Sequence, residues 1–173
     1  MTVVGGDAAG QLPLTDGTVT LRAMREGDAA TLIAGRDDEF HRFLGPGSDD
    51  PRPTAVIEVD GNGEPEVVGW VDHDDHHAHP WLTPQQCNVG YHVFRAHRNR
   101  GYATRAVRLL LEQVAARATY TEATFLIDAE NGPSLRVASA VGAVERDRPV
   151  NAEGRPQVFL VVPVAAPVAA LDS

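Results

Sequence analysis

The chain contains no lysine. All 15 of its basic residues are arginine, set against 24 acidic residues, and the formal net charge is −9. A protein that binds duplex nucleic acid needs a basic face to neutralise the phosphates, so this charge balance argues against nucleic acid as a partner. The lack of lysine beside abundant Ala, Val, Asp and Gly is typical of proteins encoded by GC-rich bacterial genomes.

Cysteine and long apolar runs are also scarce. Cys87 is the one cysteine, so no disulfide can form within the chain and a reducing compartment is expected. The first ten residues carry no basic residue and no apolar core, unlike a secretory signal. The apolar stretch 158–171 is broken by Pro163 and Pro167, whereas a bilayer span needs about 20 apolar residues. The sequence therefore predicts a cytoplasmic protein with no membrane segment.

The length of the chain is that of one domain. Its 173 residues, 43% of them hydrophobic, are enough to bury a core without disulfide or metal support. No internal repeat and no long linker divides the sequence. We expect a flexible leader over residues 1–12, a folded domain over 13–163 and a C-terminal tail over 164–173.

Hydrophobic periodicity predicts helices that separate strands after a hairpin. Alternating and β-branched patterns indicate strands, and apolar residues at spacings of three and four indicate helices. The expected strands are 18–23, 55–59, 66–71, 88–94, 123–127 and 156–162. The expected helices are one capped by Asp28 and then 37–44, 102–118 and 133–141. This order predicts a single-domain α/β fold with a mixed sheet. The apolar last strand and tail offer a surface for a homodimer.

One strand-to-helix junction, residues 93–104, carries the features of an anion site. A helix start has unpaired N–H groups and the positive end of the helix dipole, which together favour a phosphate. Gly101 and Ala103 leave room for a ligand to approach the backbone, and Arg98 and Arg100 supply positive charge. The pattern predicts a phosphate or pyrophosphate site; the alternative is a basic helix start on the surface.

Two blocks of the sequence resemble a known family. The run 88–103, which includes Asn-Val-Gly-Tyr and Arg-Asn-Arg-Gly-Tyr-Ala, is similar to the acyl-CoA-binding motif of the GNAT superfamily of N-acyltransferases. The block 131–143, in which Asn-Gly-Pro-Ser opens a helix that closes on a glycine, resembles the second characteristic block of that superfamily. The Gly-Tyr strand and the Asn-x-x-Ser block are most similar to the branch that includes the ribosomal-protein N-terminal acetyltransferases.

The resemblance implies a fold, a reaction and a set of site residues. The sheet would be mostly antiparallel and flanked by helices, and an acetyl group would pass from acetyl-CoA to a primary amine by direct attack in a ternary complex. Ser134 would lie near the leaving thiol. The strand end and Asn131 would hold the pantetheine arm, and the loop and helix start would bind the pyrophosphate. The implied cofactor-binding residues are Val93, Phe94, Arg98, Arg100, Gly101, Tyr102, Ala103, Thr104 and Asn131. Helix capping is the competing explanation for Asn131 and Ser134.

The chain departs from the family pattern at Asn88. Many relatives with the Gly-Tyr strand carry a carboxylate there that serves as the base, and an amide cannot accept a proton at neutral pH. An α-amine loses only about 1 kcal/mol to deprotonation at pH 7, whereas a lysine loses about 4.6 kcal/mol. A weak or water-mediated base at this position therefore favours an α-amine or a similarly acidic amine as acceptor.

Residues 72–79 hold four histidines and three aspartates. Imidazoles and carboxylates can bind a divalent metal, but the segment lacks the spaced ligands of a structural zinc site, so we expect no metal. The resemblance places this segment near the acceptor. There His73 would be a candidate base, and Asp72, Asp74 or Asp75 would attract a cationic amine.

The sequence leaves the acceptor and the acyl chain open. A protein N-terminus and a small-molecule amine both fit, and a succinyl or longer acyl donor is not excluded. The alternative of another class is a non-catalytic acyl-CoA-binding or metal-binding domain that retains the fold, which Asn88 favours.

Overall fold

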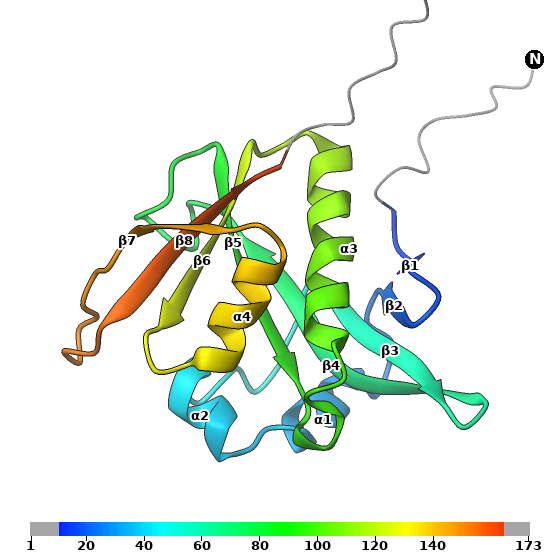
Figure 1. Cartoon of the computed structure of the whole chain (residues 1–173). Coiled ribbons are helices and arrows are strands. Elements are labelled where there is room, and N and C mark those ends of the chain that lie inside the picture. The colour runs from blue at the N-terminus through cyan, green and yellow to red at the C-terminus, as the bar shows by residue number, and fades with distance from the viewer. Residues whose placement is uncertain (1–10, 165–173) are drawn as a thin grey trace, which may run out of the picture.

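Eight strands form one sheet in the computed structural model, which describes residues 11–164 (Figure 1). Their spatial order is β1-β2-β3-β4-β5-β6-β8-β7. All neighbouring pairs are antiparallel except β5 and β6, which are parallel. The strands are β1 (Leu14–Thr15), β2 (Val19–Arg22), β3 (Ala55–Gly61), β4 (Glu64–Asp74), β5 (Gln86–Val93), β6 (Glu122–Asp128), β7 (Val144–Asp147) and β8 (Gln157–Pro163). The predicted α/β fold with a mixed, mostly antiparallel sheet is confirmed.

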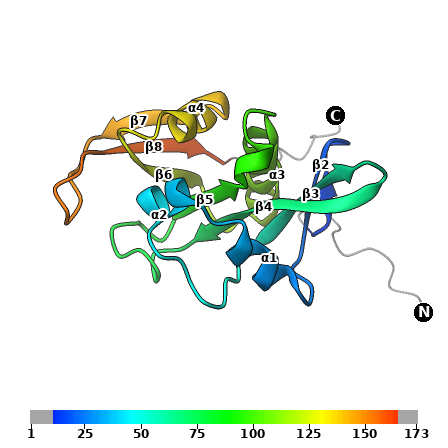
Figure 2. The same ribbon diagram turned by 90° about the horizontal axis from the view of Figure 1, so that it is seen from below.

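Helices cover both faces of this sheet. Two of them, α3 and α4, lie on one face, and α1 lies on the other, as Figure 2 shows. Figure 1 places α2 at the end of the sheet where α3 and α4 begin. The helices are α1 (Asp28–Ala34), α2 (Asp38–Leu44), α3 (Tyr102–Arg117) and α4 (Gly132–Ala140), with a short 3-10 helix at Arg95–His97. None of them is long and apolar enough to cross a membrane.

The elements with strong local patterns match their predicted ranges closely. Helix α3 buries Val107, Leu110 and Val114 of the expected stripe, and it ends where Ala118 adopts a left-handed conformation. Strand β4 runs on to Asp74, three residues beyond the prediction. Strands β1 and β7 were not predicted, because β1 is two residues long and every residue of β7 is exposed, so neither shows an apolar alternation.

The start of α1 corrects one prediction. Gly27 is the N-cap, and Asp28 is the first helical residue rather than the cap. The Asp28 carboxylate is buried and accepts hydrogen bonds from the Arg22 guanidinium and from the Arg25 backbone N–H. Arg22 also pairs with Glu58, at 2.5 Å, so one guanidinium joins β2, β3 and α1.

The two ends of the chain bear on the predicted domain limits and dimer surface. Residues 1–10 of the leader and 165–173 of the tail lie outside the described residues. Val164 is buried in the core, although the sequence placed it in the tail. The last strand, β8, pairs with β6 on one side and β7 on the other, so it offers no free edge to a second copy.

The parallel pair β5 and β6 opens the sheet. Only Gln86, Cys87 and Asn88 pair with β6, the last pairing being Asn88 with Thr124. Beyond that point the two strands separate, while β5 stays paired with β4 as far as Val93. The backbone on the β6 side of β5 is therefore without a strand partner over the segment in which the sequence predicted cofactor contacts.

Candidate active site

A cleft of about 500 Å³ lies where β5 and β6 have separated. Its lining comes from α2, the end of β5, the start of α3 with the segment before it, and α4 along its length. Figure 1 shows why these parts meet, since α3 and α4 both begin at the end of the sheet where α2 lies. Two helix N-termini therefore flank the cleft, and their dipoles favour an anionic ligand.

The start of α3 presents free backbone donors. Gly101 is the N-cap, with a φ of 78°, and no side chain caps this helix. None of the described residues accepts a hydrogen bond from the N–H groups of Tyr102, Ala103 or Thr104. A Cβ added to Gly101 would meet no atom within 4 Å, so the backbone is open to a ligand. These features are those of a pyrophosphate cradle.

Arg98 lines the cleft, as expected of a cofactor-binding residue, but its guanidinium already has partners within the protein. Its guanidinium donates to both oxygens of Asp37, at 2.9 and 3.0 Å, and it pairs with Glu39 as well. Its Nε donates to the Val93 carbonyl, at 3.0 Å. The charge of Arg98 is therefore neutralised by two carboxylates, and the side chain ties α2 to the end of β5. Arg136 of α4 also lines the cleft and pairs with no carboxylate among the described residues, while Arg100 is exposed and does not line it.

The backbone of β5 corrects a second prediction. The Phe94 N–H donates to Val68 and the Phe94 carbonyl accepts from His97, both at 2.8 Å, so neither group is free for a pantetheine arm. Backbone groups of successive residues in an antiparallel ladder face opposite sides. Since Phe94 faces β4, Tyr91 and Val93 turn their backbone groups toward the open side. The backbone groups that are free on this edge are therefore the N–H and carbonyl of Tyr91 and the N–H of Val93. The Val93 carbonyl already accepts from Arg98.

Ser134 and Asn131 lie together at the start of α4. The Asn131 side chain accepts from the Ser134 backbone N–H, at 3.2 Å, so Asn131 is the helix cap. This bond uses only the Ser134 backbone and leaves its hydroxyl at the lining of the cleft. A cap and a ligand contact are compatible at this position.

The Tyr91 hydroxyl is a neighbour of Ser134 that the sequence did not reveal. It donates to the Ser134 carbonyl, at 3.0 Å, across the opened part of the sheet. Burial raises the pKa of Tyr91 to about 12, so the phenol stays protonated at neutral pH. The two residues are 43 positions apart, and only the fold brings them together.

Asn88 lies at the last paired position before the strands separate. Its side-chain oxygen accepts from the Thr124 hydroxyl, at 3.3 Å, and the residue is half-buried. It does not line the cleft. Burial raises the pKa of the preceding Cys87 thiol to about 12, so this cysteine is a poor nucleophile and an acyl-cysteine route is disfavoured.

The structure does not bring His73 to the cleft. Its ring packs against Tyr120, just beyond the far end of α3, and its Nδ1 lies 3.0 Å from the Thr54 hydroxyl, which also contacts Asp72. Burial lowers the pKa of His73. The imidazole that does line the cleft is His92, which lies beside Phe40. Burial first, and then the nearby Arg98 charge, lower the pKa of His92 to about 4, so its ring is neutral at pH 7.

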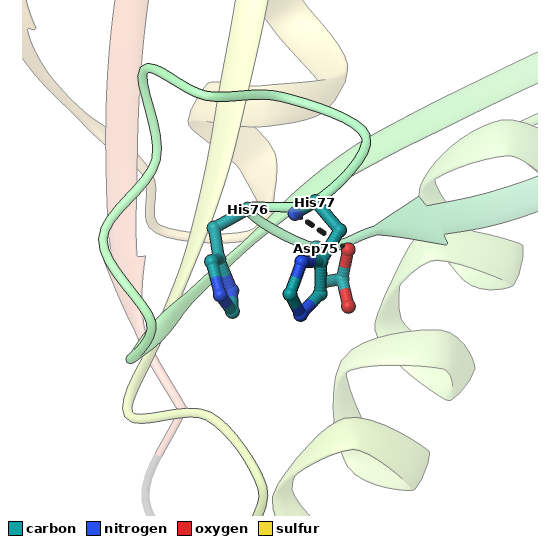
Figure 3. Close-up of side chains that lie close together, drawn as sticks. All are labelled: Asp75, His76 and His77. Atoms are coloured by element: carbon teal, nitrogen blue, oxygen red, sulfur yellow. Dashed lines mark hydrogen bonds between the residues drawn. The ribbon is translucent and has the colours of Figure 1, made fainter.

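The histidine-rich segment contains one group of potential metal ligands. Asp75, His76 and His77 each offer a ligand atom, and these atoms lie within 4.8 Å of one another. Figure 3 shows the two imidazoles side by side, with the Asp75 carboxylate next to His77. That carboxylate accepts from the His77 backbone N–H, at 2.9 Å, which is the geometry of an ordinary turn. Three adjacent loop residues do not by themselves make a metal site, and none of them lines the cleft.

The family model of the acetyltransferase (GNAT) domain matches residues 18–144. The chain belongs to this family. The match covers most of the sheet, the whole of α3 and α4, and both blocks that carried the resemblance. No curated protein matches the chain.

Solved structures share the GNAT fold with low sequence identity. YncA, a putative acetyltransferase of Salmonella typhimurium with its cofactor acetyl-CoA, aligns with a TM-score of 0.64 at 15% identity, over 88% of this chain and 97% of that one. The aminoglycoside acetyltransferase AAC(6')-Ib with coenzyme A and kanamycin gives 0.68 at 19%, over 84% and 95%. Mycobacterium smegmatis RimJ with CoA-disulfide gives 0.66 at 21%, over 85% and 82%.

Proposed function

We propose that this GNAT protein transfers an acetyl group from acetyl-CoA to a primary amine. The observation that carries the proposal is the cleft of about 500 Å³ between the separated strands, with the open α3 N-terminus at one wall. Structural relatives hold coenzyme A or acetyl-CoA. The acceptor is either a small-molecule amine or a protein N-terminus.

Three parts of the chain fit the donor. The N–H groups of Tyr102, Ala103 and Thr104 bind the pyrophosphate, and Arg136 adds positive charge. The free edge of β5 at Tyr91 and Val93 pairs with the amides of the pantetheine arm. Acetyl-CoA supplies the acetyl group as a thioester.

The hydroxyl of Ser134 is the proton donor for the leaving thiolate. It lines the cleft, and its backbone is held by the Asn131 cap and by the Tyr91 hydroxyl, so its position is fixed from two sides. A thiolate is a fair leaving group, so the assistance required is modest. The amine loses its proton to water, because Asn88 cannot accept it, and water returns a proton to the Ser134 oxygen after the thiol has left.

Acetyl-CoA should raise the melting temperature. A ligand that binds only the native state at a hundred times its Kd stabilises it by about 2.7 kcal/mol. For a domain of this size that is a shift of roughly 5–11 °C. Differential scanning fluorimetry with acetyl-CoA and with CoA measures it.

The same samples test whether the site is catalytic. Free CoA released from acetyl-CoA, followed with a thiol reagent over a panel of primary amines, should rise with at least one amine. A melting shift without thiol release from any amine would point to a non-catalytic binding domain. Millimolar CoA with no shift at all would remove the donor site itself.

Ser134→Ala should lower kcat by about ten- to a hundredfold, at or below the lower end of the roughly 100- to 10,000-fold that general acid catalysis contributes, because a thiolate needs little assistance. The Kd for acetyl-CoA should stay within about twofold, because the helix cap uses the backbone N–H of residue 134 and survives the substitution. Steady-state kinetics and isothermal titration calorimetry measure the two quantities.

Ser139→Ala is the matched control, since Ser139 is an exposed serine on the same helix that does not line the cleft. It should leave kcat unchanged. If Ser134→Ala also leaves kcat unchanged, Ser134 is not the proton donor.

A further inference from the structure

The connection between β4 and β5, residues 75–85, carries a group of side chains that acyl transfer does not use. Figure 1 shows this connection at the end of the sheet opposite to α2 and the donor cleft. Asp75, His76 and His77 lie in it, and the centroids of the two imidazole rings are 4.1 Å apart. Figure 3 shows both rings pointing the same way from the backbone, with the Asp75 carboxylate beside them.

The ligand atoms of these three residues are close enough to share one cation. They lie within 4.8 Å of one another, so one point exists that is no more than about 2.8 Å from each atom. Bonds from zinc to imidazole nitrogen and to carboxylate oxygen are about 2.0–2.2 Å long. Displacements of less than about 1 Å would therefore complete the coordination. Small rotations of the side chains suffice for this, since none of the three is fully buried.

The Asp75 carboxylate is already oriented for such a role. Its Oδ1 accepts from the backbone N–H groups of His77 and Ala78, at 2.9 and 3.3 Å. No described residue donates to Oδ2. One oxygen therefore fixes the carboxylate to the turn, and the other is left to bind a cation.

The Nδ1 atom of His76 lacks a partner. It is shielded from solvent, and no described residue forms a hydrogen bond with it. Five side-chain atoms of the described residues are buried and unpartnered in this way, and only the one on His76 belongs to a group of three potential metal ligands. A shielded polar atom without a partner costs free energy, and a bound ion is one way to supply the partner.

The donor set determines the class of cation. Two imidazole nitrogens and one carboxylate oxygen suit Zn²⁺ and similar transition-metal ions, whereas Mg²⁺ and Ca²⁺ bind chiefly through oxygen. Residues 72–79 contain three aspartates and no arginine, so the local charge also favours a cation. Three protein ligands leave the fourth tetrahedral position to water.

We propose that Asp75, His76 and His77 form a binding site for one Zn²⁺ ion. The site is independent of the proposed acyl transfer, since none of its ligands lines the donor cleft. The bound ion joins the carboxylate to both imidazoles and so stabilises the turn that follows β4.

The test is zinc binding to the untagged chain, measured by isothermal titration calorimetry without CoA or a thiol reductant, because free thiols bind zinc themselves. We expect one Zn²⁺ per chain and a higher melting temperature with zinc, since a ligand of the native state stabilises it. Mg²⁺ should cause neither effect.

His76→Gln and Asp75→Asn each remove one ligand. Loss of an outer-shell partner alone costs about 10- to 100-fold in metal affinity, so both variants should bind zinc at least tenfold more weakly. The Asn oxygen can still accept the two backbone bonds, so the turn should be kept in Asp75→Asn. The Kd for acetyl-CoA should not change in either variant.

His79→Gln is the matched control. It removes an imidazole from the same connection, but the His79 ring pairs with Asp74 and lies outside the ligand group. Its zinc affinity should equal that of the wild type. Equal losses in His79→Gln and His76→Gln would mean that zinc binds the histidines of the connection without a defined site, and would overturn the proposal. So would a wild type that does not bind zinc, or that binds it without a change in melting temperature. In each of these cases the proposed function stands.

Discussion

Gly101→Glu should reduce the affinity for acetyl-CoA at least a hundredfold and abolish the melting shift, while the protein stays folded. The new side chain stands at the N-terminus of α3, where the N–H groups of Tyr102, Ala103 and Thr104 are free. A carboxylate there repels the pyrophosphate and competes for the same donors. A Cβ at this position meets no atom within 4 Å, so the main cost to the fold is that of a left-handed non-glycine residue. Calorimetric titration with acetyl-CoA measures the loss.

Gly154→Glu is a close control for this substitution. Gly154 has the same φ, 78°, and equally open surroundings, but it lies in the connection between β7 and β8. The two variants share the backbone strain and the added negative charge, so a difference in binding isolates the location. If Gly101→Glu folds and binds acetyl-CoA as the wild type does, the pyrophosphate does not bind at the start of α3.

The parts of the fold that could be predicted are those with a local cause. The apolar stripe of α3 and the turn between β3 and β4 are determined by residues close together in the sequence. The glycine at the strand-to-helix junction is a local signal of the same kind. The same locality explains why the family blocks at 88–103 and 131–143 were visible in the sequence. Each block is a strand end or helix start whose backbone geometry its own residues determine.

Side-chain roles were harder to predict because they depend on partners far along the chain. The sequence predicted Arg98 as a phosphate ligand but could not show that Asp37, 61 positions earlier, pairs with its guanidinium. Asp28 looked like a helix cap, but Arg22 and the Arg25 backbone use its carboxylate. Such pairings cannot be predicted from neighbouring residues. The local sequence around an arginine before a helix, or an aspartate at a helix start, is the same whether or not the side chain has a distant partner.

The distinction between Asp72 and His73 depends on register. The sequence grouped both in one polar loop, whereas β4 continues through them to Asp74. Successive residues of a strand point to opposite faces, so one residue decides which side chain reaches the α1 side of the sheet. His73 packs near the end of α3, and Asp72 lines a small cavity with Leu32 of α1, although both side chains contact the Thr54 hydroxyl.

Arg22→Met should lower the free energy of unfolding by roughly 3–5 kcal/mol, because it leaves the buried Asp28 and the partly buried Glu58 without their partner. The side chains of Arg22, Asp28 and Glu58 are 9%, 9% and 15% exposed. Methionine retains much of the apolar stem, so the loss reports chiefly on the charge. The melting temperature should fall by roughly 6–20 °C. Urea denaturation at pH 7 measures the free energy.

The stability that Arg22→Met removes should decrease as the pH falls. The hydrogen bond from Arg22 is the main cause that lowers the pKa of Asp28 below its unfolded value of about 4. A lowered carboxyl pKa stabilises the fold above the unfolded pKa, and this contribution disappears as the pH falls through the folded value. The difference in the free energy of unfolding between wild type and Arg22→Met should therefore become smaller below pH 4.

Arg148→Met, which breaks an exposed pair with Glu145, should lower the free energy of unfolding by less than about 1 kcal/mol at pH 7. Equal losses for the two variants would mean that solvent screens the Arg22 cluster as fully as it screens a surface pair.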